Sequence, residues 1–134
     1  MKKIFNWPIR VYYEDTDAGG VVFYANYLKF YERARTEMLR DMGFEQDKLI
    51  AEQSIIFVVR SVQVDYLQAA KFNDLIYVTA GLSLVRSASL TFVQEITRAD
   101  VTLSTATVRI ACLDAKTMRP KLIPDFLKQA LDNE

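Results

Sequence analysis

The segment EDTDAGGVVFYANY, Glu14 to Tyr27, contains the residues of this chain best suited to chemistry. Its second aspartate, Asp17, stands a few residues before an amphipathic pattern that starts near Asn26. The first N–H groups of a helix lack intrahelical acceptors, and the helix dipole adds partial positive charge there. A carbonyl oxygen placed against that end is polarised, and a carboxylate opposite can attack the carbonyl carbon or deprotonate a water. This combination is suited to acyl transfer to water.

The chain has no histidine and only one cysteine, Cys112. Serine and cysteine hydrolase triads that use histidine are therefore excluded, and a zinc site of histidine or thiolate ligands is disfavoured. The run DAGGVV has neither the P-loop lysine nor the dinucleotide-binding spacing. We expect no metal and no cofactor, so acid–base chemistry falls to carboxylate, lysine, tyrosine or cysteine side chains.

A structural interpretation of the same segment stays open. Aspartate and threonine before a glycine pair also satisfy turn backbone, so Asp17 suits an Asx-turn or a cap. Asn26 suits an N-cap. Phe23 and Tyr24 suit packing, and the chemistry needs only a backbone N–H at that point. Cys112 lies in an apparent strand and is interpreted as a small buried hydrophobic residue.

One long helix is predicted directly after this segment. From Asn26 to Met42 the apolar residues recur at helical spacing, and Gly43 provides a stop signal. A strand is predicted before it, over Ile9–Glu14, and a short helix after it, in QDKLIAEQ. The residues that define the helical period are Tyr27, Tyr31, Ala34, Met38 and Met42.

The second half of the chain predicts a series of strands with short links. Gly81 is expected to mark a bulge, and Arg98–Asp100 a hairpin turn. Such links favour an antiparallel sheet, and one helix on one face gives an α+β domain over residues 1–134. One helix covers only part of five strands, so we expect at least a dimer. The predicted strands are Val58–Tyr66, Leu75–Val85, Ser89–Thr97 and Val101–Leu113, before a last helix in DFLKQALDN.

The composition predicts a cytoplasmic protein that neither binds nucleic acid nor spans a membrane. Seventeen basic and seventeen acidic residues cancel, without the basic excess typical of nucleic-acid binders. The longest apolar run, IIFVV, is far below the ~20 residues of a membrane helix. The basic start MKKIFNWPIR lacks a signal core, and a lone cysteine fits a reducing compartment.

The segment VYYEDTDAGGVVFYANYLKFYERARTEML closely resembles the 4-hydroxybenzoyl-CoA thioesterase family. More narrowly, it resembles the YbgC-type acyl-CoA thioesterases linked with the Tol–Pal system of Gram-negative bacteria, and the likeness continues through FVVRSVQVDY and ACLDAKTMRPKLIP. The resemblance implies a hotdog fold, a long central helix wrapped by a five-stranded antiparallel sheet. It also implies dimers that commonly pair into tetramers, an active site at the dimer interface, and hydrolysis of an acyl-CoA to a free acid and CoA.

The resemblance also implies roles for residues of the opening segment. The family's catalytic carboxylate matches Asp17, and the backbone N–H that polarises the thioester carbonyl matches Tyr24. The loop before it matches Gly19 and Gly20. YbgC-type members usually have V-Y-H-A-N-Y where this chain has V-F-Y-A-N-Y, so Tyr24 replaces a histidine. The substitution keeps the N–H and removes an imidazole, and the 4-hydroxybenzoyl-CoA branch can carry tyrosine there.

Coenzyme A is anionic, so its binding needs basic and polar contacts. Beside the two loop glycines we assign Asn26, Arg60, Arg86 and Ser87 to substrate binding, the Arg86-Ser87 pair because it resembles a region that contacts the nucleotide in relatives. The Tyr24 substitution keeps one alternative open, a non-catalytic module that binds acyl-CoA or acyl carrier protein. A hotdog hydratase, which generally uses histidine, is disfavoured.

Overall fold

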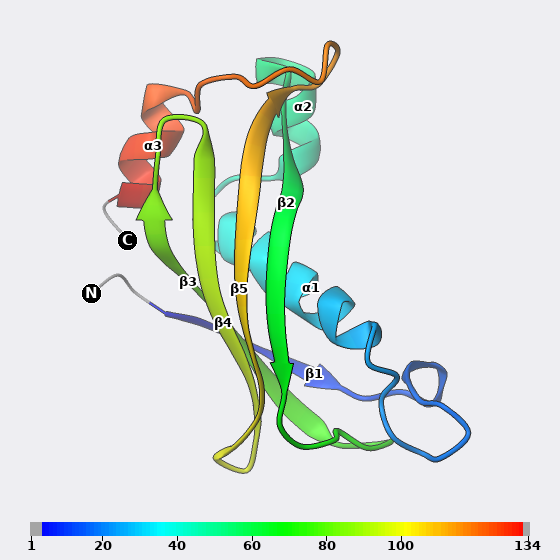
Figure 1. Cartoon of the computed structure of the whole chain (residues 1–134). Coiled ribbons are helices and arrows are strands. Elements are labelled where there is room, and N and C mark those ends of the chain that lie inside the picture. Colours follow the sequence, from blue (N-terminus) through cyan, green and yellow to red (C-terminus); the bar gives the residue numbers. More distant parts are fainter. Residues whose placement is uncertain (1–3, 133–134) are drawn as a thin grey trace.

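The computed structural model describes residues 4–132, so residues 1–3 and 133–134 of the predicted domain lie outside the described part (Figure 1). The predicted α+β architecture is confirmed: one five-stranded antiparallel sheet is combined with helices. In chain order the elements are β1 (Phe5–Arg10), the 3₁₀ helix η1 (Tyr13–Asp15), α1 (Asn26–Asp41), α2 (Gln46–Gln53), β2 (Ile55–Tyr66), β3 (Leu75–Val85), β4 (Ser89–Arg98), β5 (Val101–Asp114) and α3 (Asp125–Asp132).

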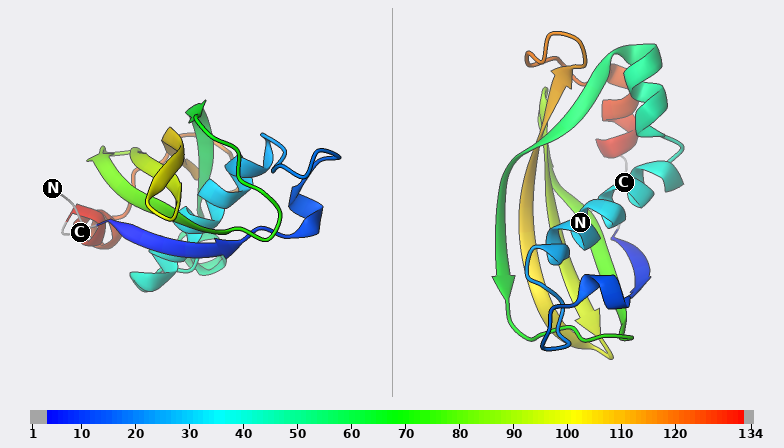
Figure 2. Two further views of the ribbon diagram at one scale, coloured as in Figure 1. Left: turned by 90° about the horizontal axis from the view of Figure 1, so that it is seen from below. Right: turned by 90° about the vertical axis from the view of Figure 1, so that its right-hand side faces the viewer.

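The strand order in the sheet is β1-β3-β4-β5-β2, which leaves β1 and β2 as the edges. The sheet curves around α1, and the three helices lie on the same side of it (Figure 2). The two residues between β4 and β5, Ala99 and Asp100, have φ of 48° and 66°. Positive φ at both central residues is typical of a two-residue hairpin turn, which confirms the hairpin predicted there.

Helix α1 forms because its apolar side chains fall on one face. Tyr27, Phe30, Tyr31, Ala34, Met38 and Leu39 are buried in the core between helix and sheet. The helix ends at Gly43, whose φ of 96° is easily reached only by glycine. The Phe44 N–H donates to the Leu39 carbonyl and the Gly43 N–H to the Arg40 carbonyl, the Schellman arrangement.

Polar side chains also join α1 to the sheet inside this core. The Arg35 Nη1 donates to the Gln94 Oε1 at 2.9 Å, and the Gln94 Nε2 donates to the carbonyls of Tyr31 and Thr79. The Tyr31 hydroxyl donates to the Ser104 Oγ at 2.6 Å. Burial lowers the pKa of Arg35 and raises that of Tyr31. Satisfied buried hydrogen bonds of this kind fix how the helix sits on the sheet.

Two local predictions were wrong. The first strand was expected over Ile9–Glu14 but ends at Arg10, and Tyr13–Asp15 is a 3₁₀ turn because the Asp15 Oδ2 accepts the Tyr12 N–H. The bulge expected at Gly81 lies between Leu82 and Leu84 instead. Gly81 itself pairs in register with β4, so it is a regular strand position.

Other features agree with the sequence. Cys112 is buried in β5 as a small hydrophobic residue. The helix predicted in DFLKQALDN is present as α3, and Asn133 of that run lies outside the described residues. Within residues 4–132, no helix combines the length and the apolarity that crossing a bilayer would require.

Candidate active site

The Asp17 loop leads from η1 to α1 as a small hairpin. Thr16 and Val22 form an isolated antiparallel bridge, and the Asp17 N–H donates to the Val21 carbonyl at 2.9 Å. Gly20 has a φ of 80°, and nothing lies within 4 Å of the Cβ that another residue would add. The glycine at this position is therefore required by the backbone rather than by space.

The Asp17 carboxylate is exposed at the tip of this hairpin. Its Oδ1 accepts the Gly19 N–H at 2.8 Å, which is the Asx-turn that the structural interpretation predicted. A Cβ on Gly19 would come within 3.3 Å of the same oxygen, so a side chain there would crowd the carboxylate. Among the described residues Oδ2 has no hydrogen-bond partner. One oxygen holds the loop and the other remains available.

The first aspartate of the segment is placed differently. Asp15 is buried, with only 6% of its surface exposed. Its Oδ2 accepts the Tyr12 N–H at 2.8 Å, its Oδ1 accepts the Asn26 Nδ2 at 3.1 Å, and its carbonyl accepts the Phe23 N–H at 3.1 Å. Asp15 thus ties the strand end, the loop and the start of α1 together. The Asn26 amide, predicted to bind substrate, is held by Asp15.

The amino end of α1 has a free donor. The Asn26 N–H donates to the Phe23 carbonyl and the Tyr27 N–H to the Tyr24 carbonyl, but the Tyr24 N–H has no acceptor within residues 4–132. The Tyr66 hydroxyl, at the end of β2, donates to the Tyr24 carbonyl at 3.1 Å. Burial raises the pKa of that hydroxyl, and the neighbouring Tyr24 and Tyr27 add to the shift. The hydroxyl is therefore a protonated donor across the neutral range.

Aromatic rings surround this helix start. The ring of Tyr66 stands edge-on to those of Tyr24 and Tyr27, with centroids 6.3 and 5.1 Å away. The rings of Phe23 and Tyr24 lie 4.8 Å apart. Phe23, Tyr24 and Tyr66 are all exposed, whereas Tyr27 is buried and its hydroxyl accepts the Ala70 N–H. The result is a partly apolar surface beside the free N–H.

The link between β2 and β3 is hydrogen-bonded to the Asp17 loop. The link between β2 and β3 runs beside the hairpin, where Val21 bridges Lys71. The Val22 N–H donates to the Ala70 carbonyl at 2.8 Å, and the Phe72 N–H to the Gly20 carbonyl at 3.2 Å. The loop that carries Asp17 is therefore held in place by main-chain hydrogen bonds.

The predicted binding residues fall into two groups. Gly19, Gly20 and Asn26 lie in the loop and helix start just described. Arg60 is exposed within β2, at the register shift between Val59 and Ser61. Arg86 and Ser87 are exposed in the β3–β4 turn, at the α3 end of the molecule and away from the start of α1 (Figure 1). Within one chain these two do not join the Asp17 loop.

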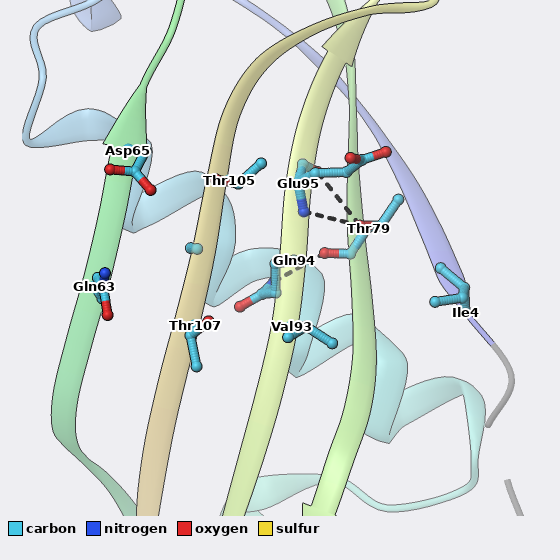
Figure 3. A pocket seen from close by; sticks show the side chains of 10 residues that line it. Ile4, Gln63, Asp65, Thr79, Val93, Gln94, Glu95, Thr105 and Thr107 are labelled. Atoms are coloured by element: carbon cyan, nitrogen blue, oxygen red, sulfur yellow. Dashed lines mark hydrogen bonds between the residues drawn. The ribbon is translucent and has the colours of Figure 1, made fainter. Parts of the chain in front are cut away.

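A cavity of about 530 Å³ lies away from this loop. It lies on the sheet face opposite α1 and is lined by polar and small side chains, including Gln63, Thr79, Glu95 and Thr107 (Figure 3). A crevice of about 100 Å³ between α1 and the sheet is lined by apolar residues and by polar ones that include Arg35 and Glu32. Neither cavity is lined by Asp17 or Tyr24.

Comparison with known proteins identifies the fold around this site. The thioesterase-like superfamily matches residues 11–131. The chain belongs to this superfamily. It is 49% identical to the acyl-CoA thioesterase YbgC of Haemophilus influenzae over 126 residues, 94% of this chain and 93% of that one. It is 48% identical to the acyl-CoA thioester hydrolase YbgC of Escherichia coli O6:H1, with 90% of each chain covered.

A solved structure gives the same result. The chain superposes on the probable thioesterase from Bartonella henselae with a TM-score of 0.87 and 33% identity, covering 91% of this chain and 100% of that one. The resemblance to YbgC-type thioesterases, the hotdog fold class and the assignment to the thioester hydrolases are thereby confirmed.

Sequence reasoning missed two residues of this region. Asp15 and Tyr66 are the side chains that hold the helix start, yet neither was assigned to catalysis or to substrate binding. Asp15 had a detectable signal, since it precedes Asp17 by two residues in the same motif. The contact of Tyr66 with Tyr24 had no sequence signal, because the fold alone brings these two residues together.

Proposed function

We propose that the protein is a cytoplasmic acyl-CoA thioesterase that hydrolyses an acyl-CoA to a free acid and CoA, with Asp17 and the Tyr24 N–H as its reacting groups. The observation that carries this proposal is the unpaired Tyr24 N–H at the amino end of α1, close in sequence to the exposed Asp17 carboxylate, in a chain of the thioesterase-like superfamily. The lone Cys112 thiol fits a reducing compartment.

Two routes use these groups. In one, the Asp17 carboxylate bonds to the thioester carbon, the C–S bond breaks, the CoA thiolate takes a proton from water, and water then hydrolyses the mixed anhydride. In the other, Asp17 removes a proton from water, the resulting hydroxide bonds to the carbon, and the proton passes to the departing sulfur. In both, the Tyr24 N–H stabilises the oxygen that becomes negative.

A second copy of the chain belongs to the proposed site. β2 is a twelve-residue edge strand, and an exposed edge of that length is a template for pairing with another strand. Pairing of β2 with its equivalent in another protomer gives the predicted dimer, and the open sheet face offers a surface for pairing dimers into a tetramer. Arg60, Arg86 and Ser87 then contact CoA from a neighbouring protomer. The Tol–Pal association and the acyl carrier protein partner stay predictions.

The Asp17→Asn variant tests the assignment. The Asn side-chain oxygen still accepts the Gly19 N–H, so the loop, the fold and the oligomeric state are expected to be retained. Loss of the nucleophile or base should lower kcat by about 100- to 10,000-fold. The measurement is steady-state hydrolysis of a panel of short, long and aromatic acyl-CoAs, with Asp125→Asn, an exposed carboxylate at the start of α3, as the matched control.

Near wild-type turnover by Asp17→Asn on every acyl-CoA would remove Asp17 from the mechanism. Tight acyl-CoA binding by the wild type without any turnover would instead favour the non-catalytic binding module. Single-turnover hydrolysis in ¹⁸O-labelled water separates the two routes. Label in the Asp17 carboxylate supports the anhydride, and its absence supports general base catalysis.

A further inference from the structure

The three consecutive peptide groups around the Tyr24 N–H are each held by a hydrogen bond. The N–H of Phe23, one residue earlier, donates to the Asp15 carbonyl at 3.1 Å. The carbonyl of Phe23, in the same peptide group as the Tyr24 N–H, accepts the Asn26 N–H at 2.8 Å. The carbonyl of Tyr24 accepts the Tyr66 hydroxyl at 3.1 Å. The direction of the free N–H is therefore determined on both sides.

Two side chains supply this support from distant segments. Asp15 is held in place by its buried carboxylate, which accepts the Asn26 Nδ2 at 3.1 Å and the Tyr12 N–H at 2.8 Å. Tyr66 comes from the end of β2, and its ring packs edge-on against Tyr24 and Tyr27. A charged acceptor and an aromatic hydroxyl thus converge on one turn of backbone.

We infer that Asp15 and Tyr66 are positioning residues that aim the Tyr24 N–H at the thioester oxygen. This inference rests on the proposed function and deepens it. Neither side chain needs to touch the substrate, because each acts through the backbone of residues 23–25. A donor that is held in place before the reaction stabilises a developing oxyanion without reorganising at that moment.

Isosteric variants test each support separately. Tyr66→Phe keeps the ring and removes the hydroxyl, and Asp15→Asn places an amide donor against the Asn26 amide. We expect each to lower kcat by about 10-fold, and by up to about 100-fold if the turn moves by 1 Å, with little change in KM. The control is Tyr77→Phe on the outer sheet face, whose hydroxyl forms no hydrogen bond within the described residues.

A donor–acceptor exchange tests whether Asp15 acts through Asn26. In the double variant Asp15→Asn with Asn26→Asp, the new amide at 15 donates to the new carboxylate at 26. Recovery of most of the kcat lost in Asp15→Asn is expected. No recovery, together with unchanged unfolding by urea, counts against a positioning role for the Asp15 carboxylate.

The hydrogen bond that the Tyr24 N–H donates can also be measured without turnover. The probe is the ketone analogue of an acyl-CoA, with a methylene group in place of the thioester sulfur and ¹³C at the carbonyl. The analogue carries the acyl group of the acyl-CoA that is hydrolysed fastest. If no acyl-CoA is hydrolysed, it carries a butanoyl group. A hydrogen bond from Tyr24 moves the bound carbonyl resonance downfield, and Tyr66→Phe and Asp15→Asn should each reduce that shift while Tyr77→Phe does not.

The outcomes separate this inference from the proposed function. A shift that depends on Asp15 and Tyr66, in a protein without turnover, would retain the inference and reject the thioesterase. Turnover with a shift that neither variant alters would retain the thioesterase and overturn the inference. An analogue that does not bind, or binds without a shift, also overturns it.

Discussion

Asp15 and Asp17 show how two identical residues, two positions apart, take different roles. Asp15 is buried. Both of its carboxylate oxygens and its carbonyl oxygen accept an N–H, so this residue organises the backbone around it. Asp17 is exposed and keeps one carboxylate oxygen unpaired among the described residues. A carboxylate with an unpaired oxygen keeps an acceptor available, whereas a carboxylate whose oxygens are all paired with donors is structural.

At the same scale, the proposed role of the Tyr24 backbone is testable apart from its side chain. Tyr24→Pro removes the N–H, which forms no hydrogen bond within the described chain, and should lower kcat by about 100- to 1,000-fold. Tyr24→Phe keeps the N–H and the ring and should lose less than about tenfold. Both are measured by steady-state acyl-CoA hydrolysis, with circular dichroism as the check on folding. Equal losses in the two variants would place the chemistry on the hydroxyl instead.

At the scale of elements, α1 is held on the sheet by a buried polar contact as well as by its apolar face. Gln94 in β4 accepts from Arg35 and donates to carbonyls of α1 and β3, so one side chain joins three elements. Arg35 is 9% exposed, and Gln94 is its hydrogen-bond partner within the described residues. A buried guanidinium without an acceptor is costly, so this contact fixes the position of the helix that carries the free N–H.

Gln94→Leu should therefore destabilise the fold. Losing the acceptor for a buried charge costs about 3 kcal/mol in the free energy of unfolding. Gln63→Leu, an exposed glutamine on β2, should change it by less than about 0.5 kcal/mol. Urea unfolding followed by fluorescence measures both. A loss below 1 kcal/mol for Gln94→Leu would mean that solvent reaches Arg35 easily enough to replace the amide.

At the scale of the whole molecule, one chain leaves apolar surface and a strand edge uncovered. The long edge strand β2 exposes three large hydrophobic side chains, those of Val59, Val62 and Tyr66. Within the described part of the chain, the sheet face opposite α1 carries no helix (Figure 2). Both features are expected of a protomer within an oligomer, and the edge at β2 lies beside the aromatic surface around the start of α1.

Val62→Lys tests the proposed dimer. Val62 and Val101 are both 42% exposed, the first on the β2 edge strand and the second at the β4–β5 hairpin. A lysine at position 62 should disfavour strand pairing and produce monomer, with loss of acyl-CoA hydrolysis, whereas Val101→Lys should remain oligomeric and active. Sedimentation velocity and steady-state rates give the two readouts. An active monomer from Val62→Lys would mean that one chain holds a complete site.

The sequence by itself determined the elements whose cause is local. The apolar period of α1, the stop at Gly43 and the alternating strands fix secondary structure through neighbouring residues, so the α+β class followed from the pattern. The motif around Asp17 and Tyr24 was specific enough to indicate the superfamily. The end of the first strand was misplaced because the Asp15 carboxylate, not strand propensity, sets the backbone at Tyr12 and Tyr13.

Only the tertiary structure decided which side chains meet. Tyr66 reaches Tyr24 across forty-two positions, and Gln94 reaches Arg35 across fifty-nine. Such contacts depend on strand register and on how the helix lies across the sheet, which local sequence does not encode. The distinction between Asp15 and Asp17 has the same origin, because burial and hydrogen bonding are properties of the folded chain. The local sequence pattern therefore identified the candidate residues, and their burial and hydrogen bonds in the folded chain distinguish them.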